Sequence, residues 1–330
     1  MNKKLVYIFA VLVVGLFVIS ACEQAVGRKI SKAEDDNVKI QRMADVEVQQ
    51  AVVNIGDIDR DIEQIELLRP VVPNPNNPEI QWVTGLQCGG SINEELIEEN
   101  DGDRNFALTE DLECEGSGIL IEADDVNLVC NGHRITGPGV NNNLIYGIYA
   151  EGVSGISILG CEISGFNGGI AFNHVEESEL IDNTANENYN YGIILRESSS
   201  NTLTENTANE NRYFGIYLSY YGSSNTLTEN TANENLYGIF LQERSSNNIL
   251  TENTANKNGE EGIYLSYSSS SNTLTENTAN ENEGKGILVS GESNTLIGNT
   301  ANENRYGGIY FHVEGSDNII TRQELVCSTS

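Results

Sequence analysis

Aromatic side chains recur at one position of a repeated motif and are the residues of this sequence best placed to bind a ligand. Each of the following comes one residue after a Gly-Ile pair: Tyr149, Tyr217, Phe240, Tyr264 and Tyr310. If the isoleucine points inward in a strand, the next side chain points outward. Aromatic rings along one outward face, flanked by polar groups, suit stacking on the sugar rings of a neutral polysaccharide. The alternative interpretation is that aromatic residues simply favour strands and shield a flat sheet.

The carboxylates and histidines show no catalytic grouping along the sequence. Asp124 and Asp125 are adjacent, and we interpret them as part of a solvated turn. His133 lies in an Asn-Gly-His turn, for which we predict a structural role, whereas His174 and His312 stand alone. The sequence therefore assigns no catalytic residue.

Metal ligands are equally sparse. Soft metals such as copper need grouped Met, Cys or His ligands, which the sequence lacks. Oxygen ligands are abundant, and Asp101, Asp103 and Asn105 have a loop-like spacing that allows a weak calcium hypothesis. No glutamate follows at the EF-hand position, so a polar surface loop is the preferred interpretation. We predict no metal site and no cofactor.

The elements that must position the aromatic side chains are short strands in a repeat. The Gly-Ile pairs lie 22 to 24 residues apart, at Gly147, Gly169, Gly192, Gly215, Gly238, Gly262, Gly286 and Gly308. Between them runs the block Asn-Thr-Leu-Thr-Glu-Asn-Thr-Ala-Asn-Glu-Asn, which is complete at 201–211, 225–235 and 272–282. Apolar residues alternate with period two, as in strands, and Asn and Gly dominate the connections. This repeat predicts an all-β fold, a single-stranded right-handed parallel β-helix with coils ~4.8 Å apart.

One asparagine of each block is predicted to stack on its equivalents in the neighbouring coils. These residues are Asn206, Asn230, Asn253, Asn277 and Asn299. An amide at the same bend of every coil can donate to one neighbouring coil and accept from the other, and asparagine tolerates the left-handed backbone of a sharp corner. We therefore predict a structural asparagine ladder.

Two segments resemble the opening coils of pectin-lyase-like β-helix proteins: 108–112 (Leu-Thr-Glu-Asp-Leu) and 118–137, which contains Val-Asn-Leu-Val-Cys-Asn-Gly-His-Arg-Ile-Thr-Gly. The asparagine-rich repeats downstream resemble NosD-type (periplasmic copper-binding) and carbohydrate-binding and sugar-hydrolase (CASH) repeats. The resemblance covers residues 85 to 325 and implies the fold. It leaves the activity open, since such proteins include lyases, hydrolases, epimerases and non-enzymatic binders. The Asp-Pro-His-Glu motif of alginate epimerases is missing.

The N-terminus has the features of an export signal. A basic start at 1–4 precedes an apolar run at 5–19, and small residues lead to Cys22. The tetrapeptide 19–22 (Ile-Ser-Ala-Cys) resembles a prokaryotic lipobox, which implies a signal peptide at 1–21 and lipidation of Cys22. An uncleaved membrane anchor is the main alternative.

Three further segments follow the signal peptide. Residues 22–69 are predicted to be a lipid-anchored polar or helical tether, in which isoleucines recur at helical spacing. Residues 70–84 form a proline-rich linker. The β-helix is predicted to occupy residues 85–327.

Export changes how the cysteines are interpreted. Besides Cys22 the chain has Cys88, Cys114, Cys130, Cys161 and Cys327. An oxidising compartment favours disulfides, but the sequence leaves their pairing open, and five is an odd number.

The charge restricts the partners. With 18 basic and 49 acidic residues the chain has a formal net charge of −31, which repels nucleic acids. We predict a periplasmic or cell-surface lipoprotein, attached to the membrane through its lipid anchor, that binds an extended glycan or cell-surface polymer without catalysis. The alternatives are a carbohydrate-active enzyme (a polysaccharide lyase, hydrolase or epimerase) with its site in the irregular segments 85–175 or 283–327, and a structural spacer or adhesin.

Overall fold

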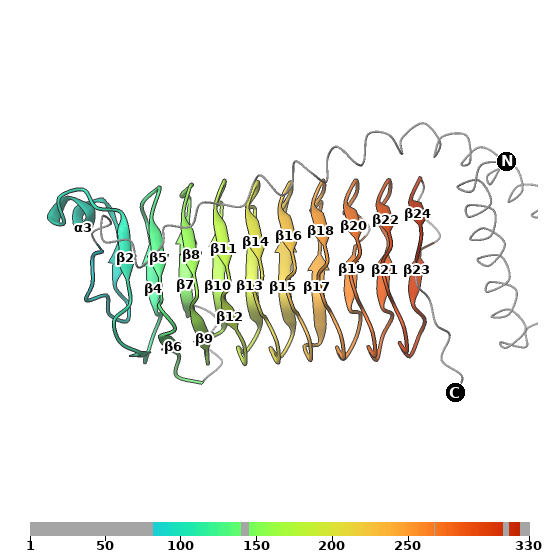
Figure 1. The fold of residues 1–330 in the computed structure, drawn as a ribbon, viewed down its shortest axis with the longest axis horizontal. Coiled ribbons are helices and arrows are strands. Elements are labelled where there is room, and N and C mark those ends of the chain that lie inside the picture. Colours follow the sequence, from blue (N-terminus) through green and yellow to red (C-terminus); the bar gives the residue numbers. More distant parts are fainter. Residues whose placement is uncertain (1–81, 140–144, 267, 313–316, 324–330) are drawn as a thin grey trace, which may run out of the picture. The chain divides into compact units, whose positions relative to one another are not determined.

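The computed structural model describes residues 82–139, 145–266, 268–312 and 317–323. The predicted signal peptide, Cys22, the tether and most of the linker lie outside these residues, as does Cys327. Within them, no helix is long and apolar enough to cross a membrane. The described residues form a parallel β-helix whose coils follow one another in chain order (Figure 1). The predicted fold is confirmed.

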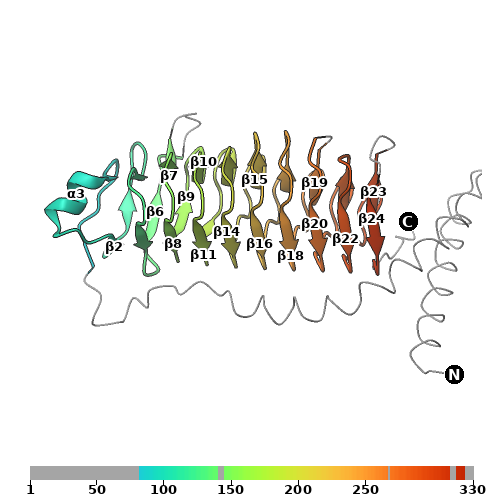
Figure 2. The ribbon, with the colours of Figure 1, turned by 90° about the horizontal axis from the view of Figure 1, so that it is seen from above.

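Each coil contributes strands to three parallel sheets, here called sheets I, II and III, which enclose one core (Figures 1 and 2). Sheet I contains β1 (Ser91–Ile92), β4 (Ile119–Ile121), β7 (Tyr146–Glu151), β10 (Gly168–Asn173), β13 (Tyr191–Arg196), β15 (Phe214–Ser219), β17 (Tyr237–Leu241), β19 (Ile263–Leu265), β21 (Ile287–Val289) and β23 (Ile309–Phe311). Sheet II contains β2 (Asn105–Ala107), β5 (Asn127–Val129), β8 (Ser157–Leu159), β11 (Glu179–Ile181), β14 (Thr202–Thr204), β16 (Thr226–Thr228), β18 (Ile249–Thr251), β20 (Thr273–Thr275), β22 (Thr295–Ile297) and β24 (Ile319–Thr321).

Sheet III is the shortest and consists of β3 (Leu112–Glu113), β6 (Arg134–Thr136), β9 (Glu162–Ser164) and β12 (Thr184–Ala185). Beyond β12 it continues as single parallel bridges between threonines, from Thr184–Thr207 to Thr278–Thr300. On this side the chain therefore pairs through only one to three residues per coil.

The core is built from identical side chains stacked in register. Ile193 pairs with Ile216 in sheet I, and Leu203 pairs with Leu227 in sheet II. These residues and the stacked alanines, such as Ala208, have no exposed surface. Since each coil repeats the same sequence, the same side chain meets itself ~4.8 Å away along the axis, and the apolar surface of every coil is buried by its neighbours.

The glycine of each Gly-Ile pair is required by close packing. A Cβ atom on Gly215 would lie 2.7 Å from Nδ2 of Asn235 and 2.8 Å from the carbonyl oxygen of Ala208. Both neighbours belong to the stacked columns of the core and corner. A side chain here would therefore separate the coils, which explains the fixed recurrence of glycine.

One short helix, α3 (Glu94–Glu99), is inserted between β1 and β2, and the repeat analysis did not predict it. Asn93 caps it, since its side chain accepts a hydrogen bond from the backbone N–H of Leu96 at 2.9 Å. Ile97 is buried and joins the core at the N-terminal end of the coils. The first parallel pairing joins Val83 to Phe106.

Candidate functional site

Every regular coil turns three corners, and each corner uses the same pair of residues. The first has a left-handed backbone, as in Ser200 (φ 59°), Glu205 (φ 57°) and Glu210 (φ 56°). The next is a buried asparagine, as in Asn206 and Asn211. The exposed residue makes the turn and the asparagine satisfies the backbone groups that the turn leaves unpaired.

The five predicted ladder asparagines occupy the corner between sheets II and III, and all are fully buried. Oδ1 of Asn230 accepts the backbone N–H and the side-chain amide of Asn206, both at 3.0 Å. Nδ2 of Asn230 donates to the carbonyl oxygen of Leu203 at 2.8 Å and to Oδ1 of Asn253 at 3.0 Å. Each amide therefore bonds the coils on both sides of it.

Two more buried ladders were not predicted. One runs along the corner between sheets I and II: Asn201, Asn225, Asn248, Asn272 and Asn294. The other runs along the corner between sheets III and I: Asn188, Asn211, Asn235, Asn258, Asn282 and Asn304. The sequence contained the pattern that predicts them, because these asparagines recur in the same block as the asparagines of the predicted ladder. All three ladders hold the coils together. The groups that could bind a ligand must therefore lie on the outer surface.

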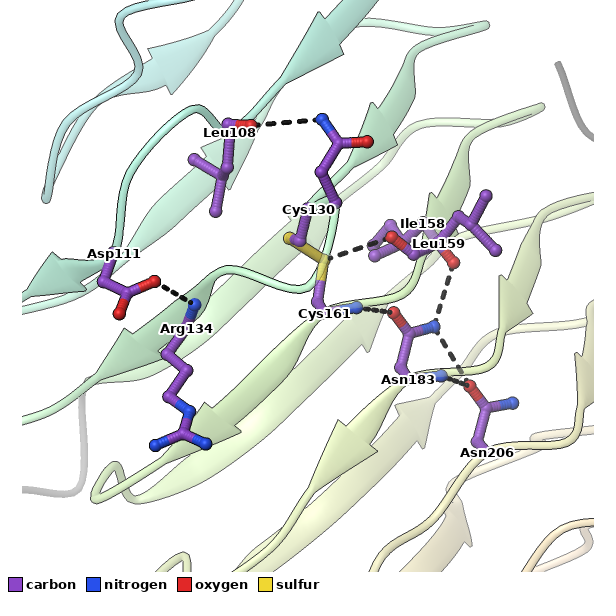
Figure 3. Close-up of a disulfide and its surroundings, with 10 residues drawn as sticks. Leu108, Asp111, Cys130, Arg134, Ile158, Leu159, Cys161, Asn183 and Asn206 are labelled. Atoms are coloured by element: carbon purple, nitrogen blue, oxygen red, sulfur yellow. Dashed lines mark hydrogen bonds between the residues drawn. A yellow bond between two sulfur atoms is a disulfide. The ribbon is translucent and has the colours of Figure 1, made fainter. Parts of the chain in front are cut away.

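A disulfide begins the predicted ladder at its N-terminal end (Figure 3). Cys161 donates its backbone N–H to Oδ1 of Asn183 at 3.0 Å, and Asn183 bonds in turn to Asn206. Cys161 is bonded to Cys130 of the preceding coil, and a second disulfide joins Cys88 to Cys114. The pairing that the sequence left open is thus resolved for four cysteines.

The repeated aromatic side chains point away from the core, but Tyr217 and Phe240 are buried and Tyr149 and Tyr264 are half-buried. They form a second apolar cluster on the outer face of sheet I, separate from the core. Its members are Tyr146, Tyr149, Ala171, Tyr191, Ile194, Phe214, Tyr217, Tyr237, Phe240 and Tyr264. Tyr217 and Phe240 are each only 8% exposed, whereas Tyr310 lies outside the cluster and is 43% exposed.

The rings of this cluster cover one another. Phe214 and Tyr217 stack with centroids 4.6 Å apart, and Phe240 and Tyr264 do so at 4.7 Å. In β7, β15 and β17 an aromatic residue stands on each side of the Gly-Ile pair, which places a second set of rings beside the predicted stripe. The faces of the inner rings are therefore occupied, and a sugar has access to ring faces only at the edges of the cluster.

Burial changes the acidity of the phenols. Desolvation raises the pKa of Tyr217 far above its ordinary value, and the hydroxyls of Tyr191 and Tyr220 and the carboxylate of Glu243 add to the effect. Desolvation also raises the pKa of Tyr191 and Tyr237. These hydroxyls remain neutral hydrogen-bonding groups over the whole physiological range.

Two exposed aromatic residues lie side by side in the chain at the edge of this face where sheet I turns toward sheet II. Tyr220 and Tyr221 are 45% and 54% exposed and both have left-handed backbone conformations, which bulky residues rarely adopt. The guanidinium of Arg196 lies 5.8 Å from the Tyr220 ring, and that of Arg244 lies 5.5 Å from the Tyr221 ring. Nη1 of Arg244 also donates to the Tyr221 hydroxyl at 2.7 Å.

A shallow depression of about 280 Å³ lies here, lined by Tyr220, Tyr221, Glu243, Arg244 and Ser268. It brings together aromatic rings, a carboxylate and a guanidinium, none of which was predicted as a site residue. The signal in the sequence was the Tyr-Tyr-Gly segment, which interrupts the repeat after β15. The prediction that a unique site lies in 85–175 or 283–327 does not include it.

A second depression, of about 330 Å³, lies at the opposite edge, where sheet III turns into sheet I. Its lining is Gly139, Gly165, Phe166, Glu187, Asn188, Tyr189, Glu210 and Arg212. The Arg212 guanidinium is 4.6 Å from the Tyr189 ring and donates to its hydroxyl. Both edges of the aromatic face thus carry an arginine stacked on a tyrosine of the preceding coil.

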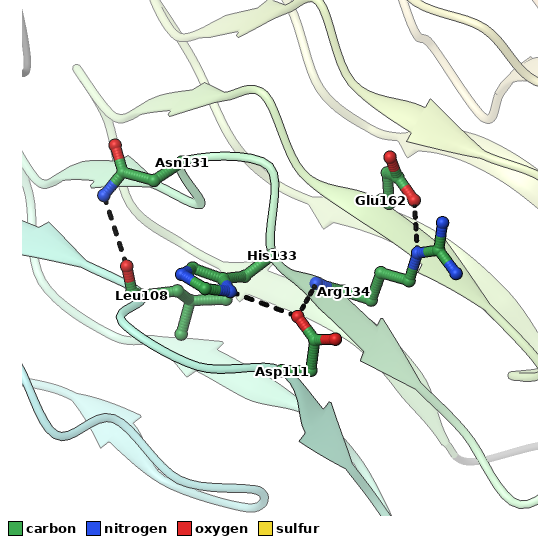
Figure 4. Close-up of polar contacts among 6 residues, drawn as sticks. All are labelled: Leu108, Asp111, Asn131, His133, Arg134 and Glu162. Carbon is green, nitrogen blue, oxygen red and sulfur yellow. Dashed lines mark hydrogen bonds and ion pairs between the residues drawn. The ribbon is translucent and has the colours of Figure 1, made fainter.

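The structure also brings together polar groups that are far apart in the sequence (Figure 4). Nδ1 of His133 is 3.1 Å from Oδ1 of Asp111, and Nε of Arg134 donates to Oε2 of Glu162 at 2.6 Å. The backbone N–H of Arg134 donates to the Asp111 carboxylate at 3.1 Å. That hydrogen bond and the one with His133 lower the pKa of Asp111. Coil stacking thus brings together an acid and a histidine that lie 22 positions apart and are not grouped along the sequence.

The residues of the calcium hypothesis are not gathered into a metal site. Among the residues that the structure describes, no group of three or more His, Cys, Asp or Glu side chains could hold a metal ion. Oδ1 of Asn105 accepts a hydrogen bond from Asn127 at 3.0 Å, so it already has a protein partner.

Two family models match the chain. The model described as "Right handed beta helix region" matches residues 117–266, and the model described as "Periplasmic copper-binding protein (NosD)" matches residues 209–328. No curated protein matches the sequence.

Several solved structures have a similar fold. One is the periplasmic alginate epimerase AlgG, with 16% identity and a TM-score of 0.53 over 75% of this chain and 85% of that one. Another is the A-module of the Azotobacter vinelandii mannuronan C-5 epimerase AlgE6, with 13% identity and a TM-score of 0.54 over 68% of this chain and 80% of that one. A third is the pectate lyase Pel9A, with 16% identity and a TM-score of 0.52 over 68% of this chain and 70% of that one.

The described residues do not fit the copper of the family description. Copper is held by grouped thiolate, thioether or imidazole ligands. The four described cysteines are consumed in disulfides, and the histidines at 133, 174 and 312 belong to no metal-binding group within the described coils. We derive no chemistry from copper.

Proposed function

The chain is a NosD-type parallel β-helix protein, and from this premise we propose that it is an exported protein that binds polysaccharide through the outer face of sheet I. The observation that carries the proposal is the set of exposed Tyr220 and Tyr221 with Glu243 and Arg244 at the border of the aromatic cluster. Exposed aromatic faces beside fixed hydrogen-bonding groups are the usual composition of a sugar site.

Export is supported by independent observations. Two disulfides between coils suit an oxidising compartment. The NosD description and the AlgG title both name periplasmic proteins. Together with the predicted signal peptide, they support a location outside the cytoplasm, where the predicted lipid on Cys22 would anchor the protein to a membrane.

The charge of the protein selects among glycans. The chain has a formal net charge of −31 and therefore repels uronate polymers and sulfated polymers at low salt. A neutral extended polysaccharide, or another neutral polymer of the cell surface, has no such barrier. We therefore expect neutral glycans to be retained in preference to anionic ones.

The experiment compares retention of the wild type and of the Tyr220→Ala, Tyr221→Ala double variant on immobilised glucan, mannan, xylan and chitin. The wild type should be retained by at least one of them, and the variant should lose at least about tenfold in affinity, since stacking and hydrogen bonding contribute roughly 1–2 kcal/mol. Tyr306→Ala is the matched control, because Tyr306 is 63% exposed but does not line the depression that contains Tyr220 and Tyr221. Failure of the wild type to bind any of these polymers contradicts the proposal.

A second candidate function is polysaccharide cleavage or epimerisation, and the polar group around His133 favours it. The Asp111 carboxylate orients the imidazole through Nδ1, which leaves Nε2 available to move a proton. Arg134 supplies a neighbouring positive charge. New reducing ends, unsaturated products or inverted sugar residues that vanish in His133→Ala would establish this function. If no polysaccharide is bound or altered, the remaining candidate is a structural spacer or adhesin.

A further inference from the structure

The two depressions at the edges of sheet I are joined by a line of aromatic side chains along a single coil. The segment around β15 contains Tyr213, Phe214, Tyr217, Tyr220 and Tyr221. The Arg212 guanidinium is 5.4 Å from the Tyr213 ring, the Tyr213 and Phe214 centroids are 6.4 Å apart, and Phe214 stacks on Tyr217. Tyr220 and Tyr221 follow β15 in the chain and line the depression that contains Arg244.

Both ends of the line repeat one arrangement. Arg212 stacks on Tyr189 beside Glu187 and Glu210, as Arg244 stacks on Tyr221 beside Glu243. In each case the arginine lies in the coil after its tyrosine and donates to the tyrosine hydroxyl. A guanidinium held in this way still has unused N–H groups, which can donate in pairs to vicinal sugar hydroxyls.

We propose that an uncharged, unbranched glycan segment lies along β15, parallel to the strand and perpendicular to the β-helix axis, with one end at Arg212 and the other at Arg244. This inference rests on the proposed glycan-binding function and specifies the ligand class and direction of the same face. The inner rings expose mainly their edges, so they form an apolar surface between the two arginine–tyrosine pairs. These two pairs, at Arg212 and Arg244, are called the anchors below.

The charges at the anchors set the ligand class. Each arginine is accompanied by at least one glutamate, so neither depression has a net positive charge that would attract an anionic sugar. Carboxylates accept hydrogen bonds from hydroxyl groups, and guanidinium groups donate to them. This combination suits the hydroxyl groups of neutral sugars.

The distance between the anchors sets the ligand length. β15 has six residues, Phe214–Ser219, and therefore spans ~20 Å. A disaccharide is too short to reach both edges, whereas a hexasaccharide is long enough. Affinity should consequently rise steeply with chain length until both anchors are filled.

The test is calorimetric titration of the wild type with the disaccharide and the hexasaccharide of whichever polymer the protein retains among glucan, mannan, xylan and chitin. The hexasaccharide should bind at least about tenfold more tightly than the disaccharide. Arg212→Gln and Arg244→Gln should each weaken hexasaccharide binding by about tenfold, the effect of losing one charge-assisted pair of hydrogen bonds. Each single variant should also bind the hexasaccharide little better than the disaccharide.

Arg305→Gln is the matched control. Arg305 follows the ladder residue Asn304 as Arg212 follows Asn211, and it lies 5.4 Å from the Tyr306 ring, away from the β15 line. It should leave binding unchanged, and the melting temperature of every variant checks the fold. The transverse arrangement is overturned if the two oligosaccharides bind with equal affinity, or if Arg212→Gln binds the hexasaccharide as tightly as Arg305→Gln does. In either case, retention on the polymer still supports glycan binding. Absence of retention by the wild type contradicts the proposed function itself.

Discussion

At the scale of single residues, the asparagine at a corner contributes more to the stability of the fold than the turn residue before it. The left-handed turn position accepts serine, glutamate, lysine or glycine in different coils, for example Lys257 and Gly298. The position that follows is a buried amide, because it must satisfy two backbone groups of the preceding coil and also donate to the side-chain oxygen of the next asparagine. Repetition of the same amide makes each ladder self-complementary.

We predict that Asn230→Ala lowers the free energy of unfolding by about 3 kcal/mol. The alanine leaves the N–H of Asn206 and the carbonyl of Leu203 buried without partners, each at a cost of roughly 1–3 kcal/mol. Chemical denaturation followed by circular dichroism measures the change.

Asn233→Ala is the control. Asn233 belongs to a partly buried column outside the corners, and its side chain accepts one hydrogen bond, from the backbone of Asn256 at 2.7 Å. This variant should lose about 1 kcal/mol, the ordinary contribution of one hydrogen bond. Equal losses in the two variants would show that burial in the ladder has no special role.

At the scale of elements, the strands of sheet I have different inner and outer chemistry. Inner positions carry the isoleucines that any coil needs, whereas outer positions carry rings that stack into a separate cluster. The rings protect the flat outer face, which supports the interpretation that aromatic residues shield the sheet. Ligand access is left to the edges, where the chain departs from the repeat.

The buried phenols predict sensitivity to alkaline conditions. Folding raises the pKa of Tyr191, Tyr217 and Tyr237 above the ordinary tyrosine value of 10.0, so the unfolded chain loses these protons first as the pH rises. The stability contribution is fully present below about pH 10 and is lost as the pH rises further. Tyr217→Phe should therefore flatten the decline of the unfolding free energy above pH 10. If the pH dependence of the unfolding free energy above pH 10 is unchanged in this variant, Tyr217 is not the source of the alkaline sensitivity. The pH dependence of the same variant near neutral pH is the internal reference.

At the scale of the whole molecule, local contacts between consecutive coils account for the architecture. Two disulfides reinforce the first, less regular coils, where the asparagine ladders have not yet begun. Many of the acidic residues lie at exposed turn positions, as in Glu205, Glu229 and Glu252, and recur there from coil to coil. This arrangement keeps a repetitive surface soluble.

We predict that the wild type fractionates with membranes and that Cys22→Ser is released into the soluble fraction. The serine cannot accept a lipid through a thioether, so the anchor is lost while the β-helix, which begins far downstream, is unaffected. Fractionation followed by immunodetection measures the distribution. Unchanged membrane association of the variant would favour an uncleaved membrane helix over a lipid anchor.

The sequence by itself determined the parallel β-helix, its coil length and the direction of each repeated side chain. These properties follow from a period of 22 to 24 residues and from strand alternation, which are local patterns. The predicted asparagine ladder was found because its members occupy one position of the block, and the other two ladders were within reach of the same argument.

Only the tertiary structure decided which side chains share a surface. The stacking of two rings per strand buries Tyr217, and the pairing of Arg212 with Tyr189 and of Arg244 with Tyr221 depends on how successive coils align. The contact between Asp111 and His133 has the same origin. Residues one coil apart in the chain become neighbours only when the coils stack, so short motifs did not reveal these groups.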